Sequence, residues 1–180
     1  MDSAEQEDAF RDGRIDLGIL QSPPADAERW LRVEKVYTDA LVAALPEPHR
    51  LAARRIALGD LATESFVLFP RSVDPALYDE IITRCRSAGF SPSVVQEAAG
   101  WHTLSGLVGA GVGVAFVPRS LSKIERPGVV YRPVADLSDD MEMFAAWKKG
   151  EKSPVRERFV TALRAVAGAG KKTSRGRGRR

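Results

Sequence analysis

The stretch Gly106-Leu-Val-Gly-Ala-Gly-Val-Gly-Val-Ala-Phe-Val-Pro118 says most about the fold of this chain. Apolar residues recur at helical spacing up to Val108. Gly111 follows them and suits the left-handed residue that commonly ends a helix. Residues 112–117 then form a short apolar run before a proline, which is typical of a strand covered on both faces. The stretch therefore predicts a helix, a glycine turn and a buried strand.

These glycines do not form a phosphate-binding loop. The pattern G-x-G-x-x-G needs a third glycine where Val114 or Phe116 stands. The order is also helix, glycine, strand, whereas a dinucleotide site needs a helix N-terminus after the glycines to face the phosphates. We therefore expect the glycines to serve packing.

The composition is that of a soluble globular protein. Of the 180 residues, 44% are hydrophobic and 28% are charged, which fits one domain or two small lobes. The acidic, polar N-terminus does not read as a signal peptide, and no apolar run reaches the roughly 20 residues of a membrane helix. The single cysteine, Cys85, has no partner for an internal disulfide, which predicts a cytoplasmic location. Its helical spacing from Ile81 and Ala88 favours a buried side chain over a nucleophile.

The net charge of +3 comes from one end of the chain. Residues 171–180 contain six cations and no acid, and removing them leaves 21 cations against 24 acids, a charge of −3. This segment lacks apolar residues and is predicted to be disordered. We favour a solvated tail over non-specific phosphate contacts with nucleic acid.

Strand and helix patterns alternate along the chain, which predicts an α/β fold with mainly parallel sheets. Ser3 and Gln6 have the spacing of a capping box, and Gly13 stands where that first helix should end. The last predicted helix opens at Pro154 and carries Val155, Phe159, Leu163 and Val166 on one face. The other predicted helices cover residues 75–88 and 103–110, and the predicted strands cover 15–20, 30–36, 40–45, 66–69, 94–95, 112–117, 129–133 and 143–147.

Catalytic and metal-binding patterns are missing from the sequence. His49 and His102 have no further ligand at metal-binding spacing, and neither a G-x-S-x-G elbow nor a P-loop occurs. His102 can be a ligand contact or an exposed residue at a helix start, and we favour the second. No catalytic residue, metal or cofactor is predicted.

Taken together, the segments resemble the effector-binding domain of LysR-type transcriptional regulators. The resemblance covers residues 4–167, and the order of the motifs makes it specific. The matching pieces are residues 12–20, 43–51, 58–61 with 66–70, 89–92 with Gln96 and Glu97, 107–118 and 131–133.

The resemblance implies a periplasmic-binding-protein type 2 fold, in which two α/β lobes flank a ligand cleft. Residues 1–35 and 138–168 would form an incomplete first lobe, residues 36–137 the second lobe, and residues 169–180 a disordered basic tail. The family's winged helix-turn-helix, its linker helix and the opening strand-helix-strand of its first lobe have no counterpart in the sequence. We therefore expect no sequence-specific DNA recognition by this chain and at most non-specific contacts from Lys171–Arg180.

Six ligand contacts are predicted, and the resemblance implies all of them except Ser72, which is predicted from its place in the sequence. Gln21 matches a position that is an arginine in some members, and a glutamine there supplies hydrogen bonds but no charge. Arg32 matches a second arginine near a secondary pocket, or is a surface cation. Ser72, next to Arg71, stands before a helix N-terminus that favours anions, or is a polar loop residue. Pro75 and Leu77 match the apolar edge of the cleft, although Leu77 also fits a core position, and Trp101 matches the pocket mouth.

The sequence therefore predicts the ligand-sensing domain of a LysR-type bacterial regulator, which binds a small-molecule co-inducer, for instance a small organic acid, and is not an enzyme. The full-length form is expected to be a homo-oligomer. Three alternatives remain: a solute-binding protein of the same fold, an enzyme on that fold, and a non-functional fragment.

Overall fold

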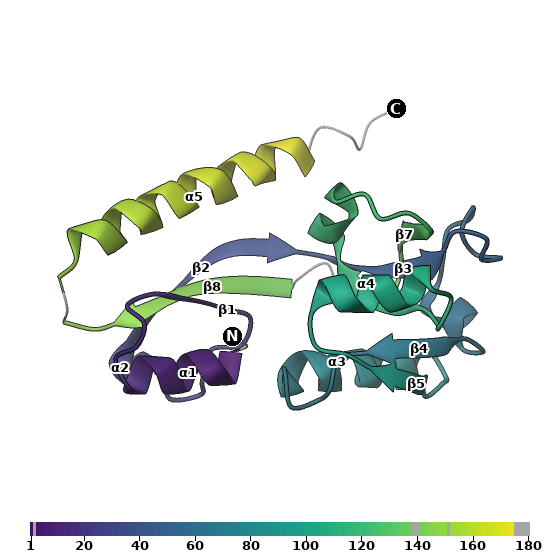
Figure 1. The fold of residues 1–180 in the computed structure, drawn as a ribbon, viewed down its shortest axis with the longest axis horizontal. Helices are drawn as coiled ribbons and strands as arrows, with labels where there is room; N and C mark the ends of the chain where they lie inside the picture. Colours follow the sequence, from purple (N-terminus) through teal and green to yellow (C-terminus); the bar gives the residue numbers. More distant parts are fainter. Residues whose placement is uncertain (2, 138–140, 151, 175–180) are drawn as a thin grey trace. The chain divides into compact units, whose positions relative to one another are not determined.

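The computed structural model describes residues 1, 3–137, 141–150 and 152–174 (Figure 1). The chain separates into two compact units, each with its own core. Unit 1 takes Met1–Thr38 and Glu142–Arg180, and unit 2 takes Asp39–Met141. Part of the predicted tail, residues 175–180, lies outside the described residues.

Unit 1 is built on a three-stranded sheet in the order β1-β8-β2. Strand β1 (Gly18–Leu20) runs antiparallel to β8 (Met141–Lys148), and β2 (Leu31–Asp39) lies on the other side of β8. Helix α1 (Ser3–Arg11) packs against β1, and the short helix α2 (Ala27–Trp30) leads into β2. The small core consists of Phe10, Leu20, Ala27, Leu31 and Ala146.

The side chain of Gln6 binds strand β1 instead of capping its own helix. Its Nε2 donates to the carbonyl of Ile19 at 2.9 Å, and its Oε1 accepts from the amide of Ile19 at 3.0 Å. The predicted capping box is therefore wrong. Strand β1 is an edge strand whose backbone groups need partners, and Gln6 supplies both a donor and an acceptor.

Unit 2 contains a three-stranded sheet and a two-stranded one. Strand β3 (Leu41–Pro46) runs antiparallel to β6 (Ala115–Pro118) on one side and to β7 (Val129–Pro133) on the other. Strands β4 (Ser65–Leu68) and β5 (Ser93–Glu97) pair in parallel. Two short 3₁₀ helices, η1 (Leu58–Leu61) and η2 (Arg119–Lys123), complete the connections.

Helices α3 (Pro75–Ser87) and α4 (Trp101–Gly109) belong to unit 2, and both begin just after a strand of the parallel pair (Figure 1). Asp74 caps α3, since its carboxylate accepts a hydrogen bond from the Leu77 amide at 3.1 Å. Cys85 is fully buried on the inner face of α3, as predicted, and this burial raises the pKa of its thiol to about 11.

The glycine-rich stretch forms a helix, a turn and a buried strand in the predicted order, although the strand begins at Ala115 and the expected first residue, Val112, is 39% exposed. Gly111 has a φ of +77°, the left-handed conformation expected after α4. Gly113 lies against strand β4, and a Cβ atom there would be 2.5 Å from the Ser65 carbonyl oxygen. The next residue, Val114, donates to that oxygen and accepts from the Val67 amide, both at 2.8 Å. A packing role for Gly113 is confirmed.

The prediction of mainly parallel sheets was wrong. Strand β3 pairs antiparallel with both β6 and β7, and β1 pairs antiparallel with β8. Strands that follow each other in the chain, such as β2 and β3, lie in different sheets, so their alternation with helices does not fix the direction of pairing. Among the described residues, the parallel pairings are β4 with β5 and two isolated bridges, Ile56 with Val134 and Phe66 with Val114.

Helix α5 (Pro154–Ser174) differs from its prediction in two ways. It continues to Ser174, past residue 169 where disorder was expected, and Ala169, Lys171 and Lys172 are residues that favour helix. Its predicted apolar face is also largely exposed, with Val155 at 79%, Phe159 at 52% and Val166 at 73%. Among the side chains of α5 that the structure describes, residues 154–166, the buried ones are instead Arg156 and Val160.

We predict that Gly113→Ala lowers the free energy of unfolding by about 1–3 kcal/mol, because the added methyl group meets rigid backbone at Ser65. Urea unfolding followed by circular dichroism measures this change. Gly59→Ala is the matched control, since a Cβ there would meet its nearest neighbour, the Ala88 carbonyl oxygen, at 3.8 Å. Equal stability of the two variants would contradict the packing role.

Candidate functional site

The carboxyl ends of strands β4 and β5 define one edge of unit 2. The strands are parallel, and the Ala98 amide after β5 donates to the Leu68 carbonyl at 3.0 Å. Helices α3 and α4 begin close after this edge, at Pro75 and Trp101. Ligands of open α/β sheets bind outside the carboxyl ends of strands, so this edge is a candidate site.

Four of the six predicted contacts belong to this edge. Ser72 and Pro75 are exposed, in the loop before α3 and in its first turn. Leu77 is only 9% exposed and belongs to the core of unit 2, which agrees with the core interpretation. The half-buried Trp101 ring meets the Phe69 ring edge-on, with centroids 5.5 Å apart and planes at 77°. Trp101 is therefore held by the end of β4.

Arg71, in the loop before α3, forms its ion pair within unit 2. Its Nε and Nη2 donate to the two carboxylate oxygens of Asp79 on α3, at 2.8 and 2.6 Å. The hydrogen bonds from Arg71 lower the pKa of the Asp79 carboxyl. An anion at Ser72 would therefore depend on backbone and hydroxyl donors more than on Arg71.

The other two predicted contacts, Gln21 and Arg32, belong to unit 1. Gln21 is half-buried in the bend after β1. Arg32 is exposed on β2 and lines a cavity of about 620 Å³. We call it the basic cavity, and its lining residues are Arg32, Trp147, Lys148, Lys149, Gly150, Lys152, Arg156, Glu157, Val160, Thr161 and Arg164.

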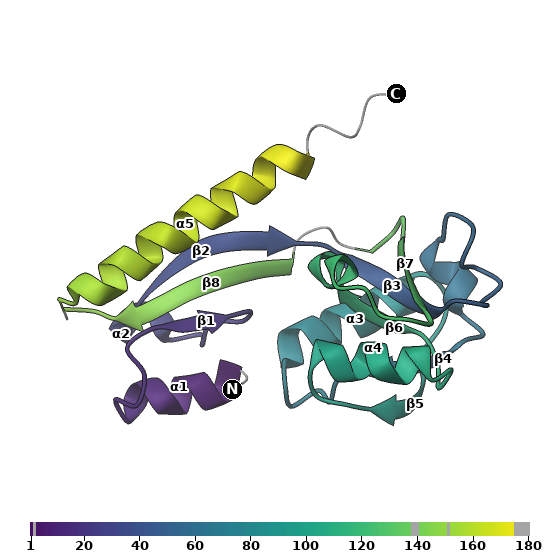
Figure 2. The same ribbon diagram turned by 45° about the horizontal axis from the view of Figure 1, so that its top comes forward.

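The basic cavity lies between α5 and strands β2 and β8, which run alongside each other in both views (Figures 1 and 2). Among the described residues that line it, six side chains are cationic and one, Glu157, is a carboxylate. Arg156 is only 6% exposed, and its guanidinium carbon stands 6.0 Å from the centre of the Trp147 ring. Of the lining residues, Arg32 alone was predicted as a contact. The signal in the sequence was the cluster of lysines at 148–152, close before Arg156.

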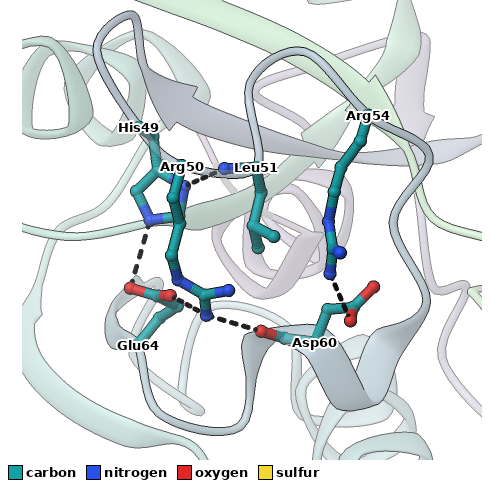
Figure 3. A network of polar contacts seen from close by, with 6 residues as sticks. All are labelled: His49, Arg50, Leu51, Arg54, Asp60 and Glu64. Atoms are coloured by element: carbon teal, nitrogen blue, oxygen red, sulfur yellow. Dashed lines mark hydrogen bonds and ion pairs between the residues drawn. The ribbon is translucent and has the colours of Figure 1, made fainter.

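A network of polar contacts in unit 2 joins the loop after β3 to η1 and the residues after it (Figure 3). Arg50 donates to Glu64 Oε1 at 2.6 Å and to the Asp60 carbonyl at 3.0 Å, and Arg54 pairs with the Asp60 carboxylate. His49 Nδ1 accepts from the Leu51 amide at 3.2 Å, and its Nε2 lies 3.1 Å from Glu64. Both ring nitrogens of His49 are thus occupied, which indicates a structural role.

The network also sets the charge state of Glu64. Burial by itself would raise the pKa of this carboxyl, but the hydrogen bonds from His49 and Arg50 outweigh it and lower the pKa. The carboxylate therefore stabilises the fold above the unfolded-state pKa of about 4.3, and this contribution is lost as the pH falls through the folded-state value.

We predict that Glu64→Gln lowers the free energy of unfolding by about 1 kcal/mol near neutral pH, because the amide keeps the shape and loses the charge. The difference from the wild type should shrink as the pH falls below about 4.3, in a series of urea titrations. Glu47→Gln, an exposed position in the loop that carries His49 and Arg50, is the control and should have little effect. A difference that stays constant with pH would contradict this assignment.

The described part of the chain contains neither a membrane-spanning helix nor a group of side chains that could hold a metal ion. No helix there is long and apolar enough to cross a bilayer. No group of three or more His, Cys, Asp or Glu side chains among those residues could hold a metal ion.

Residues 1–168 match the LysR substrate binding domain, and this chain belongs to that family. It is 33% identical over 159 residues to the transcriptional regulator AlsR of Bacillus subtilis, covering 88% of this chain and 52% of AlsR. It is 31% identical over 163 residues to the regulator CatR of Pseudomonas putida, covering 91% of this chain and 56% of CatR. The chain thus spans about half the length of these curated relatives, both of which are helix-turn-helix-type transcriptional regulators.

Solved structures show the same fold. The effector-binding domain of a BenM variant superposes with a TM-score of 0.79 at 23% identity, over 95% of this chain and 80% of that chain. The BenM effector-binding domain with its effector benzoate gives a TM-score of 0.77, also at 23% identity, over 95% of this chain and 78% of that chain. The predicted fold, an α/β protein of the LysR effector-binding type, is therefore confirmed.

Proposed function

We propose that this chain is the ligand-sensing part of a LysR-type transcription regulator and that it binds a small-molecule co-inducer without catalysis. The observation that carries this proposal is the family match over residues 1–168. DNA binding, assembly into a homo-oligomer and a cytoplasmic location belong to the same proposal. They would be properties of a whole regulator. The curated relatives are about twice as long as the region that matches this chain.

We further propose that the β4/β5 edge of unit 2 supplies part of the effector site. Two helices begin there, and backbone amides at helix N-termini favour a negatively charged group. Trp101 adds an aromatic surface that is already fixed against Phe69, so ligand contact there would order few additional groups. Ser72 adds an exposed hydroxyl. This combination suits a small organic acid with an apolar body.

A carboxylate effector is also consistent with one structural relative, since benzoate is the effector in the BenM structure. We extend only the class of compound, small organic acids, to this chain. In unit 1, Gln21 and Arg32 remain proposed contacts, and Arg32 is the one of the two that carries a charge.

We predict that titration of the chain with benzoate and a panel of small organic acids, followed by calorimetry, gives saturable binding of at least one compound. Trp101→Ala should weaken that binding about tenfold through loss of aromatic contact. Ser72→Ala, at an exposed position, should weaken it about threefold through loss of one hydrogen bond.

Thr83→Ala, at an exposed position in the middle of α3 and away from its N-terminus, is the control and should bind like the wild type. Circular dichroism checks that each variant is folded. The proposal fails if no acid binds, or if the Trp101 and Ser72 variants bind as tightly as the control.

A further inference from the structure

We propose that a small cavity beside α4 in unit 2 binds a small zwitterion, such as a free amino acid with a short side chain. We call it the α4 cavity, and its polar lining residues are His102, Ser105, Glu125, Arg126 and Tyr131. They come from α4, from the loop after η2 and from β7, and none of them is a proposed effector contact. The site therefore does not depend on the effector proposal.

The first argument is a pair of opposite charges at one small cavity. Arg126 and Glu125 are neighbours in the chain, and both line the α4 cavity. Within the described part of the chain neither side chain belongs to an ion pair, so both charges are open to a ligand. An α-amino acid carries its ammonium and carboxylate groups equally close together.

The second argument is the fixed position of the guanidinium. Arg126 Nη2 donates to the His102 carbonyl at 3.1 Å, which ties the loop to α4. Gly106 leaves the helix surface bare at this point, since a Cβ there would be 3.3 Å from Arg126 Nη1. The remaining N–H groups of a guanidinium held in this way can donate in pairs to a carboxylate.

The third argument is a buried hydroxyl in the cavity wall. Ser105 is only 1% exposed, and its Oγ accepts from the Tyr131 hydroxyl at 3.4 Å. A bond of this length is weak, because O–H···O hydrogen bonds are usually about 2.5–3.0 Å long. Buried polar groups are normally well satisfied, so both hydroxyls retain the capacity to bind a polar ligand.

The size of the α4 cavity limits the ligand. Its volume is about 160 Å³, room for about five water molecules at the roughly 30 Å³ that each occupies in the liquid. Leu121, Ile124 and Pro127 form its apolar part. Ile124 is 54% exposed, and contact with a short apolar side chain of the ligand would remove some of this surface from water.

The balance of charge decides between the classes of small ligand. A simple anion would pair with Arg126 but would also meet the Glu125 carboxylate, and a simple cation would meet Arg126. Either ligand would leave one charge of the α4 cavity without a partner. A zwitterion pairs with both, and charge-assisted hydrogen bonds are stronger than neutral ones.

The test is titration of the isotopically labelled chain with alanine, followed by amide NMR spectra. We expect saturable shifts at residues 102–106 and 124–131. Acetate and methylamine, which each carry one of the two charges, should bind at least about tenfold more weakly. Tryptophan, whose side chain exceeds the cavity, should give no saturable shifts there. The proposal is overturned if alanine does not bind, or if either singly charged compound binds as tightly.

Glu125→Gln and Arg126→Gln should each weaken alanine binding about tenfold. Arg126→Lys keeps the charge and should bind alanine more tightly than Arg126→Gln. Glu125 is exposed and its loss should leave the fold intact, so this variant decides the question if the Arg126 variants unfold.

The matched controls are Glu80→Gln and Arg55→Gln, exposed positions of unit 2 with the same changes of charge that do not line the cavity. They should bind alanine like the wild type. If they weaken binding as much as the cavity variants, the attraction is non-specific and the proposal is wrong.

This proposal and the effector proposal fail separately. Glu125→Gln should leave the binding of organic acids at the β4/β5 edge unchanged, and Ser72→Ala should leave the binding of alanine unchanged. A chain that binds alanine but no organic acid would retain the α4 cavity as a site and lose the proposed effector site.

Discussion

The close approach of Gly113 to the backbone of Ser65 is the contact on which the architecture of unit 2 depends. It lets Val114 bond to β4 on both sides of Phe66, and β6 then pairs with the central strand β3. Strand β3 is buried from Leu41 to Leu45 and receives β7 on its other side. Two sheets and the helix before the glycine are thus joined at a place where a side chain would not fit.

That arrangement has a direct consequence for the candidate effector site. Since α4 ends at the glycine turn that leads into β6, the position of its start is fixed relative to β4. The Trp101 ring lies against Phe69 at the end of β4, and α3 begins a few residues further on. The candidate effector site at the β4/β5 edge is thus positioned by the packing of the core. The cavity of unit 1 is built differently, because arginine and lysine side chains line it and the core of the unit is small.

Much of this fold could be predicted from local sequence signals. Proline and glycine marked the ends of α3 and α4, and the alternation of apolar residues located most strands. The direction of strand pairing could not be predicted, because it depends on which connections cross the sheet and not on the strands themselves. Gln6 shows the same limit, since its spacing fits a capping box but its amide pairs with Ile19, a residue 13 positions away.

The candidate sites were less predictable than the fold. Pro75 and Trp101 came from a family resemblance and Ser72 from its place before a predicted helix, and their placement in unit 2 follows from two parallel strands that end together. Of the residues that line the basic cavity, Arg32 alone was predicted, because helix α5 looked amphipathic through Val155 and Phe159, which are exposed. Arg156 is buried instead, with its guanidinium over the Trp147 ring, and Arg164, about two turns later and exposed, pairs with Glu34 on β2.

The central claim is that the β4/β5 edge of unit 2 senses a small organic acid. Hydrogen–deuterium exchange of the chain, with and without a saturating acid, tests it most directly because it reports on each segment separately. The account predicts slower exchange at residues 70–77 and 100–104, where α3 and α4 begin, and little change along β3. Unchanged exchange at both segments, while the acid binds elsewhere or not at all, would contradict it.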